Sequence, residues 1–353
     1  MIPTPFNTLR TLALAAALLA TAGNTWAGVA RTFVSAGGSD ANTTGNCAPT
    51  TPCRTFATAL GVTNAGGEIV AISSGGYGPF AIAQSVTVTV PQGVYAGISV
   101  ASGSGITIAG AGISVTLRGL TINGAGGSTA ISMTSGASLS IQGVQISNFS
   151  GASGDAGIQV NGATAVEVLD SVVRDTSCGI CVANGAALTV SRTQFLGTYS
   201  ASGTANGTAF SSIYGVLVES SDGASTTSAS VFDCFASEGV EQAYAALNPA
   251  SGGTVDLVVE RSTGGALGPA VSATTGGSAA PGAMKLSVSH SQLGAVSGVA
   301  AISAAGASTV GVADANTFAL GTGATSGLGG QVVSFGNNAT TIAGSGITVV
   351  PTK

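Results

Sequence analysis

Ionisable side chains are scarce in this sequence, and six of them recur at one position of a repeated pattern. The six are Asp170, Arg192, Asp233, Arg261, His290 and Asp314. Opposite charges on neighbouring repeats predict a ladder of exposed ion pairs, each contributing roughly 0.2–1 kcal/mol. The alternative is a polar stripe that binds the hydroxyls of a sugar polymer or carries catalysis, with His290 as a general base. We favour the ion-pair ladder.

A second group of candidate residues lies around the longest spacing between repeats. Tyr199, Phe210 and Tyr214 occur in or beside a Gly/Ser/Thr-rich insertion at 197–212, and Glu219 follows. Aromatic side chains can hold sugar rings in a groove, so these four residues form a candidate ligand site, although aromatics also anchor ordinary loops. Glu219 is the only catalytic candidate, and one acid supplies neither an acid–base pair nor a calcium cage. We therefore assign no catalytic residue, metal or cofactor.

Four of the five cysteines form two closely spaced pairs, and the fifth stands apart. Cys47 and Cys53 flank a five-residue loop, which predicts a disulfide in an oxidising compartment. Cys178 and Cys181 form a C-x-x-C motif, but no second pair or histidine follows at the spacing of a zinc site. A strand directs residues i and i+3 to opposite faces, so direct pairing of these two is expected to be awkward. With Cys234 the number is odd, and at least one thiol is expected to be free.

The first residues are typical of a cleaved export signal. Arg10 precedes an apolar run at 12–22, and Thr25, Trp26 and Ala27 form a small-residue cleavage site. A membrane-spanning helix needs roughly 20 apolar residues, so the run is too short to be an anchor. The sequence thus predicts a signal peptide at 1–27 and a secreted or periplasmic protein.

The composition excludes several classes of partner. Removal of the signal leaves eight basic and fourteen acidic side chains, a net charge of −6. A protein with so few Lys and Arg is a poor electrostatic partner for nucleic acid or anionic lipid. Only 7% of the residues are charged, and Gly is abundant. A disordered linker shares that composition, but it lacks the dense aliphatic residues seen here.

An internal repeat runs through the chain and distinguishes it from a linker. Eight anchor positions begin the units: Val115, Leu139, Val166, Leu188, Ala229, Leu257, Leu286 and Val310. An aliphatic residue follows two positions after every anchor, and the seventh position after it is apolar in most units. Successive anchors are 24, 27, 22, 41, 28, 29 and 24 residues apart. Inward-facing residues at the anchor and two positions after it fit a strand. The apolar residue seven positions after the anchor breaks this alternation, so a bend is required four or five residues after the anchor.

These units predict an all-β fold, a single-stranded right-handed parallel β-helix with three short strands per coil. An antiparallel sandwich would not keep the same residue classes at the same offset through eight units. Residues 28–65 differ and predict an N-terminal cap with a strand at 31–35 and the Cys47–Cys53 loop. A short helix at 55–64, with Phe56 and Leu60 on one face, would cover the first coil. The β-helix itself is expected at 66–353.

The segments RTFVSAGGSDAN, CAPTTPCRTFATAL and GGEIVAISSGGYGPFAIAQSVTVTVPQGVYAGI resemble the N-terminus of exported bacterial right-handed β-helix repeat proteins. These belong to the pectin-lyase-like superfold. The resemblance covers nearly all of the mature chain and is chiefly architectural. It implies kinship with pectate lyases, polygalacturonases and other polysaccharide-processing enzymes, and with β-helix proteins of no known activity. Fold does not choose among them.

The resemblance also implies where a catalytic site would lie, namely on the outward side of the strand after the variable loops. Such relatives place calcium-binding aspartates or closely spaced carboxylates there. The outward residues at that place are Ser132, Thr134, Gln159, Asn161, Cys181, Ala183, Leu217, Glu219, Ser272 and Thr274. Glu219 alone is a carboxylate, so the relatives' catalytic residues have no counterparts. The sequence therefore predicts a non-catalytic secreted β-helix with a structural or carbohydrate-interacting surface, and extracellular polysaccharide as the partner. A polysaccharide lyase or glycoside hydrolase is the alternative, and no oligomeric state is predicted.

Overall fold

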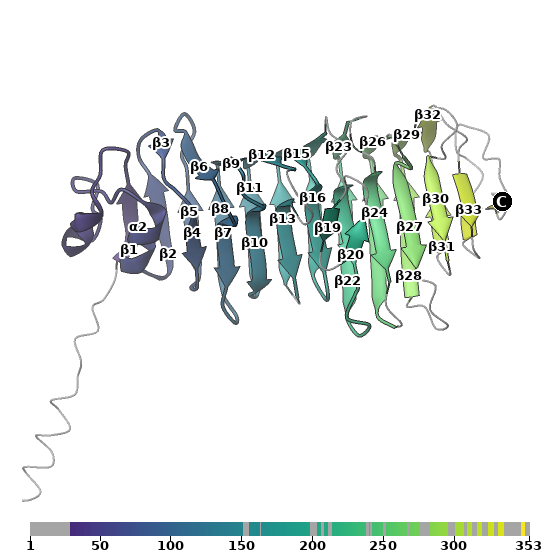
Figure 1. The fold of residues 1–353 in the computed structure, drawn as a ribbon, viewed down its shortest axis with the longest axis horizontal. Helices are drawn as coiled ribbons and strands as arrows, with labels where there is room; N and C mark the ends of the chain where they lie inside the picture. Colours follow the sequence, from purple (N-terminus) through teal and green to yellow (C-terminus); the bar gives the residue numbers. More distant parts are fainter. Residues whose placement is uncertain are drawn as a thin grey trace, which may run out of the picture.

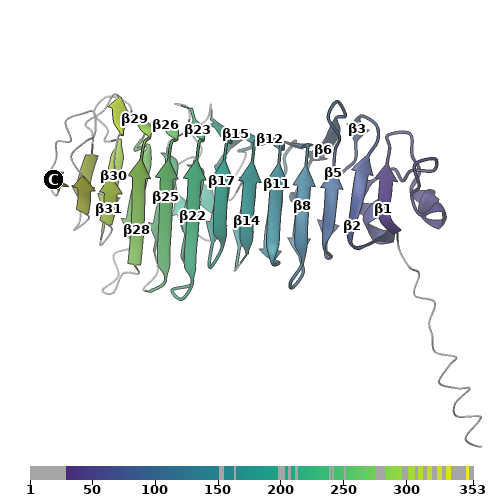
Figure 2. The same cartoon turned by 180° about the vertical axis from the view of Figure 1, so that it is seen from behind.

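The chain winds into a right-handed parallel β-helix, a rod whose sides are three parallel sheets (Figures 1 and 2). Its computed structural model describes residues 29–150, 155–162, 164–197, 203–205, 208–210, 214–237, 240, 242–249, 252–266, 268–275, 283–295, 301–306, 309–312, 316–319, 324–327, 331–334 and 347–349. The predicted signal segment lies outside these residues. Within the described part, no helix is long and apolar enough to cross a membrane.

Each coil of the rod contributes one strand to each sheet. Sheet A contains β1 (Val29–Val34), β2 (Thr63–Ala71), β5 (Val86–Thr89), β8 (Ser114–Arg118), β11 (Ser138–Gln142), β14 (Ala165–Leu169), β17 (Ala187–Ser191), β22 (Thr226–Phe232), β25 (Thr254–Glu260), β28 (Ala283–Ser289), β31 (Thr309–Val312), β34 (Gln331–Ser334) and β35 (Ile347–Val349). Sheet B contains β3 (Gly75–Gly76), β6 (Ala96–Val100), β9 (Leu120–Gly124), β12 (Gln145–Phe149), β15 (Val172–Thr176), β18 (Gln194–Leu196), β23 (Phe235–Ala236), β26 (Thr263–Ala266), β29 (Gln292–Ala295) and β32 (Thr317–Ala319).

Sheet C follows the loops of variable length. It contains β4 (Phe80–Ile82), β7 (Ser104–Ala109), β10 (Thr129–Ser135), β13 (Ala156–Asn161), β16 (Cys178–Ala183), β21 (Tyr214–Glu219), β24 (Gln242–Asn248), β27 (Val271–Thr275), β30 (Ile302–Ala305) and β33 (Ala324–Gly327). The long insertion adds a small antiparallel pair, β19 (Gly203–Ala205) and β20 (Thr208–Phe210).

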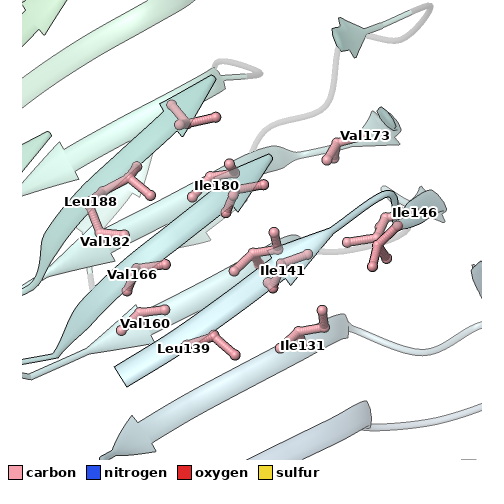
Figure 3. Packing of buried hydrophobic residues seen from close by; sticks show 14 of the residues in the cluster. Ile131, Leu139, Ile141, Ile146, Val160, Val166, Val173, Ile180, Val182 and Leu188 are labelled. Carbon is pink, nitrogen blue, oxygen red and sulfur yellow. The ribbon is translucent and has the colours of Figure 1, made fainter. Parts of the chain in front are cut away.

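The repeat register predicted from the anchors is the register of sheet A. Leu139 of β11 pairs with Val166 of β14, which pairs in turn with Leu188 of β17. Their side chains point into the rod and stack on one another through successive coils (Figure 3). Each such aliphatic side chain contributes roughly 1.5–3 kcal/mol when it is buried. The core is therefore one continuous apolar column.

The bend predicted after the anchors is a single residue in the left-handed conformation, between sheet A and sheet B. It recurs in seven consecutive coils with φ between 47° and 73°. The residues are Gly119, Gly143, Asp170, Arg192, Asp233, Arg261 and His290. A residue with a positive φ bends the chain sharply from sheet A to sheet B, and the residue after it is buried in every one of these seven coils.

The inward residue after the corner forms a second ladder, which the sequence analysis did not identify. In five coils the residue directly after the corner carries a side chain with a hydroxyl or a thiol. In the last coil the corresponding polar residue is an asparagine, one position further on. These residues, the inner ladder, are Ser171, Thr193, Cys234, Ser262, Ser291 and Asn316, and all are buried.

Hydrogen bonds join the inner ladder from one coil to the next. The amide of Val144 donates to Ser171 Oγ at 3.2 Å, and the amide of Ser171 donates to Thr193 Oγ1 at 3.4 Å. The amide of Cys234 donates to Ser262 Oγ at 3.1 Å, and that of Ser262 donates to Ser291 Oγ at 3.2 Å. Corner amides that the strand ladders cannot reach are satisfied in this way inside the rod.

The N-terminal cap matches its predicted elements. The helix α2 (Phe56–Val62) begins after Thr55, whose hydroxyl accepts a hydrogen bond from the amide of Thr58 at 3.2 Å. Phe56 is fully buried against the end of the core, and a 3-10 turn η1 (Asp40–Gly45) precedes the helix. Cys47 and Cys53 form the predicted disulfide, and their loop pairs with the free edge of β1. The edge is thereby protected from joining a second chain.

Cys178 and Cys181 also form a disulfide, so the expectation that strand geometry disfavours their pairing is wrong. Gly179 faces the core, where a β-carbon would lie 2.9 Å from Cδ1 of Phe195, and Ile180 faces the core as well. Two successive inward residues shift the alternation by one, and both cysteines therefore lie on the outer face of β16. Cys234 is the free thiol, and burial raises its pKa to about 11.

The inner ladder predicts a marked difference between two Thr→Val substitutions four residues apart. Thr193→Val removes the acceptor of the Ser171 amide, so a buried donor is left unsatisfied and the free energy of unfolding should fall by about 1–3 kcal/mol. Thr189→Val makes the same change on the exposed face of β17 and should alter the free energy of unfolding by less than about 0.5 kcal/mol. Urea denaturation of both variants measures the difference, and equal losses would contradict the role of the inner ladder.

The cysteine assignments predict the titration of thiols with a thiol-reactive dye. The native protein should react negligibly, because the neutral thiol of Cys234 is buried. Unfolding without a reductant should expose one thiol per chain, and reduction should expose all five. Three thiols in the unreduced unfolded chain would show that Cys178 and Cys181 are not bonded.

Candidate functional site

Two ion pairs occupy the outer side of the corner between sheets A and B. Arg192 contacts Asp170 of the preceding coil through two hydrogen bonds, Nε to Oδ1 at 2.6 Å and Nη2 to Oδ2 at 3.0 Å. Arg261 contacts Asp233 in the same manner, at 2.9 Å and 3.2 Å. Two-point contacts of this kind match the planar guanidinium to the carboxylate. Each of these two arginines is therefore bound to an aspartate of the preceding coil.

These contacts set the electrostatics of the corner. The hydrogen bonds from Arg192 and its charge hold the pKa of Asp170 below its ordinary value, and Arg261 does the same for Asp233. Arg261 also contacts the carboxylate of Glu260, and its guanidinium lies over the ring of Phe232, 6.0 Å from the ring centre. Both side chains of each pair remain half exposed. The corner thus presents paired charges to solvent, with little net charge.

The other two residues predicted for this ladder do not extend the pairing within the described chain. His290 takes the next corner position and is exposed, and no ion pair of its side chain is found there. Asp314 lies outside the described residues. The structure therefore places five of the six predicted residues in one column and pairs four of them.

The candidate site around Glu219 has a different character from the one expected. Glu219 points to the outer side of β21 between Ala183 and Leu247 of the neighbouring strands, and it is fully buried. Tyr214 is only 7% exposed and packs with Cys181 in a small apolar cluster on the same outer face. These side chains do not line an open groove in this structure. A catalytic role for Glu219 stays a prediction.

The two remaining aromatics of that prediction cannot be placed at the site. Tyr199 lies outside the described residues, and Phe210 ends β20 without a described side chain. Among the described residues, no three His, Cys, Asp or Glu side chains come close enough to hold a metal ion.

A shallow depression on the outer face of sheet A is the open site that the sequence analysis missed. It spans four neighbouring strands, β11, β14, β17 and β22, which Figure 2 shows side by side, and it has a volume of about 520 Å³. The outward residues that line it are Ser138, Ser140, Ala165, Glu167, Ala187, Thr189, Ser228 and Ser230. Five of these eight residues carry a hydroxyl group, and polar and apolar atoms share the surface of the depression about equally.

The depression follows from the strand alternation in sheet A. Residues on either side of each anchor point outward, and at these positions in the four coils every side chain except that of Glu167 is small. Ala165 of β14 and Ala187 of β17 are direct neighbours across the two strands. Their small side chains leave open space between the serines of β11 and β22. Glu167 is the only ionisable residue of the lining, and its Oε2 accepts a hydrogen bond from Ser140 at 3.3 Å. The two outward columns of Ser, Thr and Ala were visible in the sequence and could have indicated this surface.

Comparison with known proteins shows no family for this chain. No protein-family model matches the sequence, and no curated protein matches it. A rhamnogalacturonan lyase is similar in structure with a TM-score of 0.41 and 11% identity, over 87% of this chain and 76% of the lyase. The pectate lyase Pel9A is similar with a TM-score of 0.37 and 12% identity, over 91% and 78%. At this level of similarity, the comparison carries no argument about activity.

The ion pairs predict how the carboxylates at the corner titrate. Arg192→Gln should raise the pKa of Asp170 toward the ordinary value of about 3.9, because the hydrogen-bonded cation is lost. The pKa of Asp170 is lower in the folded than in the unfolded protein, so the ion pair stabilises the fold fully at a pH above the unfolded pKa. This stabilisation is lost as the pH falls through the lower folded pKa. NMR titration of the Asp170 carboxyl measures the shift.

Arg261→Gln serves as the control for this prediction. It removes the partner of Asp233 and should leave the pKa of Asp170 nearly unchanged. An Asp170 pKa that does not respond to Arg192→Gln would show that the pair does not form in solution.

Proposed function

We propose that this protein is an exported, non-catalytic β-helix that binds a neutral polysaccharide on the outer face of sheet A. The hydroxyl-lined depression across β11, β14, β17 and β22 is the observation that carries the proposal. Sugar polymers present hydroxyls at regular intervals, and hydroxyl side chains both donate and accept hydrogen bonds. Coils repeat at about 4.8 Å, so the rod offers such groups in a regular row.

The charge of the protein supports a neutral ligand. The formal net charge is −5, and Arg192 and Arg261 are already held by carboxylates. Glu167 adds a negative charge to the depression. A polyanion such as a uronate polymer would be repelled at this surface, because no cationic side chain belongs to its lining.

The lining also supports binding without cleavage. Glycoside hydrolysis uses two carboxyl groups that flank the scissile bond, and lyase chemistry needs a base near an activated carbon. Glu167 is the only acid of the depression, and Ser140 donates a hydrogen bond to it. Export is supported by the two disulfides, which persist in oxidising compartments.

Blocking the depression should abolish polysaccharide binding. Ala187 is exposed at its floor, and Ala187→Tyr would fill the space with a residue that suits a strand. Affinity electrophoresis in gels containing mixed-linkage β-glucan, xyloglucan or galactomannan should show retardation of the wild type. The variant should lose at least about tenfold in affinity for the polymer that binds.

The matched control places the same side chain elsewhere on the rod. Gln145→Tyr lies on the exposed face of sheet B and should bind as the wild type does. Polygalacturonate should cause no retardation. The absence of binding to every neutral polymer would contradict the proposal. Reducing ends or unsaturated sugars in the incubations would contradict its non-catalytic part and favour a lyase or hydrolase.

A further inference from the structure

An exposed aromatic ring lies at the corner next to the depression. Among the described residues, the large hydrophobic side chains exposed to solvent are Ile72, Tyr95 and Phe235. Phe235 is 44% exposed and begins β23, directly after the corner that follows β22. The outward residues Ser228 and Ser230 of β22 line the depression. One edge of the depression and the exposed ring therefore lie on the same coil.

Polar residues neighbour Phe235 along the chain and in the two adjacent coils. Gln194 of β18 and Thr263 of β26 are its partners in the neighbouring coils, each at the strand spacing of about 4.8 Å. Asp233 precedes it by two residues, and that carboxylate binds Arg261. An apolar platform with an amide, a hydroxyl and an ion pair at its edge suits a ligand with an apolar face and polar edges. A pyranose ring has this character.

The exposed aromatic residue Tyr95 differs from Phe235 because its ring packs against the protein itself. Its ring lies against the backbone of Gly97, where a β-carbon would come within 2.8 Å of Cζ. The corner after β5 in that coil carries no ion pair within the described chain. Tyr95 is 53% exposed, more than Phe235, and is therefore a demanding control.

The geometry points to Phe235 as a stacking platform for one sugar ring of the bound neutral polysaccharide, an inference that rests on the proposed function. Gln194, Thr263 and the Asp233–Arg261 pair would bond to the hydroxyls of that ring. The polymer would then run from the depression along β22 and around the corner to β23. The β22 edge of the depression and Phe235 lie on one coil, so a single polymer chain can contact both.

Tryptophan fluorescence can report stacking at this position directly. The only tryptophan of the chain is Trp26, in the predicted signal segment. In the double variant Trp26→Phe, Phe235→Trp, the single indole would occupy the platform. Addition of the neutral polysaccharide that retards the wild type should change its emission saturably. In the control, Trp26→Phe with Tyr95→Trp, the emission should stay constant.

Affinity measurements complete the test. Phe235→Ala should weaken binding of the same polymer by roughly three- to tenfold, and Tyr95→Ala should leave it unchanged. If Ala187→Tyr abolishes binding while Phe235→Ala has no effect and the indole at 235 does not respond, the platform is refuted and the proposed function stands. If no neutral polymer binds the wild type, the proposed function fails, and the platform fails with it.

Discussion

The fold depends on a tight corner that each coil must turn between sheet A and sheet B. One residue in the left-handed conformation makes the turn, and the next amide then points into an apolar interior. A buried amide without a partner costs about 1–3 kcal/mol, and the rod would incur that cost in every coil. The inner ladder satisfies these amides with side chains from the following coil, for example Ser262 Oγ for the amide of Cys234. Neighbouring coils are thus bonded at the corner as well as along their strands.

The same corner shapes the outer surface. The first two of the seven corners have glycine, the residue that adopts a positive φ most readily. The next four have Asp170, Arg192, Asp233 and Arg261. Non-glycine residues are strained there, and the ion pairs between adjacent corners offset part of that strain. Because the coil of β22 turns at the single residue Asp233, the outer face of sheet A and the aromatic residue of β23 lie on either side of a narrow edge.

Much of this arrangement was predictable from the sequence. The anchors predicted the β-helix and its register, the change of parity predicted a bend four or five residues after the anchor, and Phe56 with Leu60 predicted the cap helix. The Cys178–Cys181 disulfide was not predictable, because the two consecutive inward residues at Gly179 and Ile180 cannot be read from a period of two. Strand alternation places Glu219 on the outer side of its sheet but does not show whether other atoms cover it. The depression was missed because small residues such as Ala165 give no chemical signal by themselves.

Residue-resolved hydrogen exchange of the free protein tests the role of the corner most directly. The account predicts that the amides of Ser171, Cys234 and Ser262 exchange as slowly as strand-centre amides such as that of Val168, because they are bonded inside the rod. Exchange of these three amides at the rate of exposed turns would contradict it, since the coils would then be held together by their strands alone.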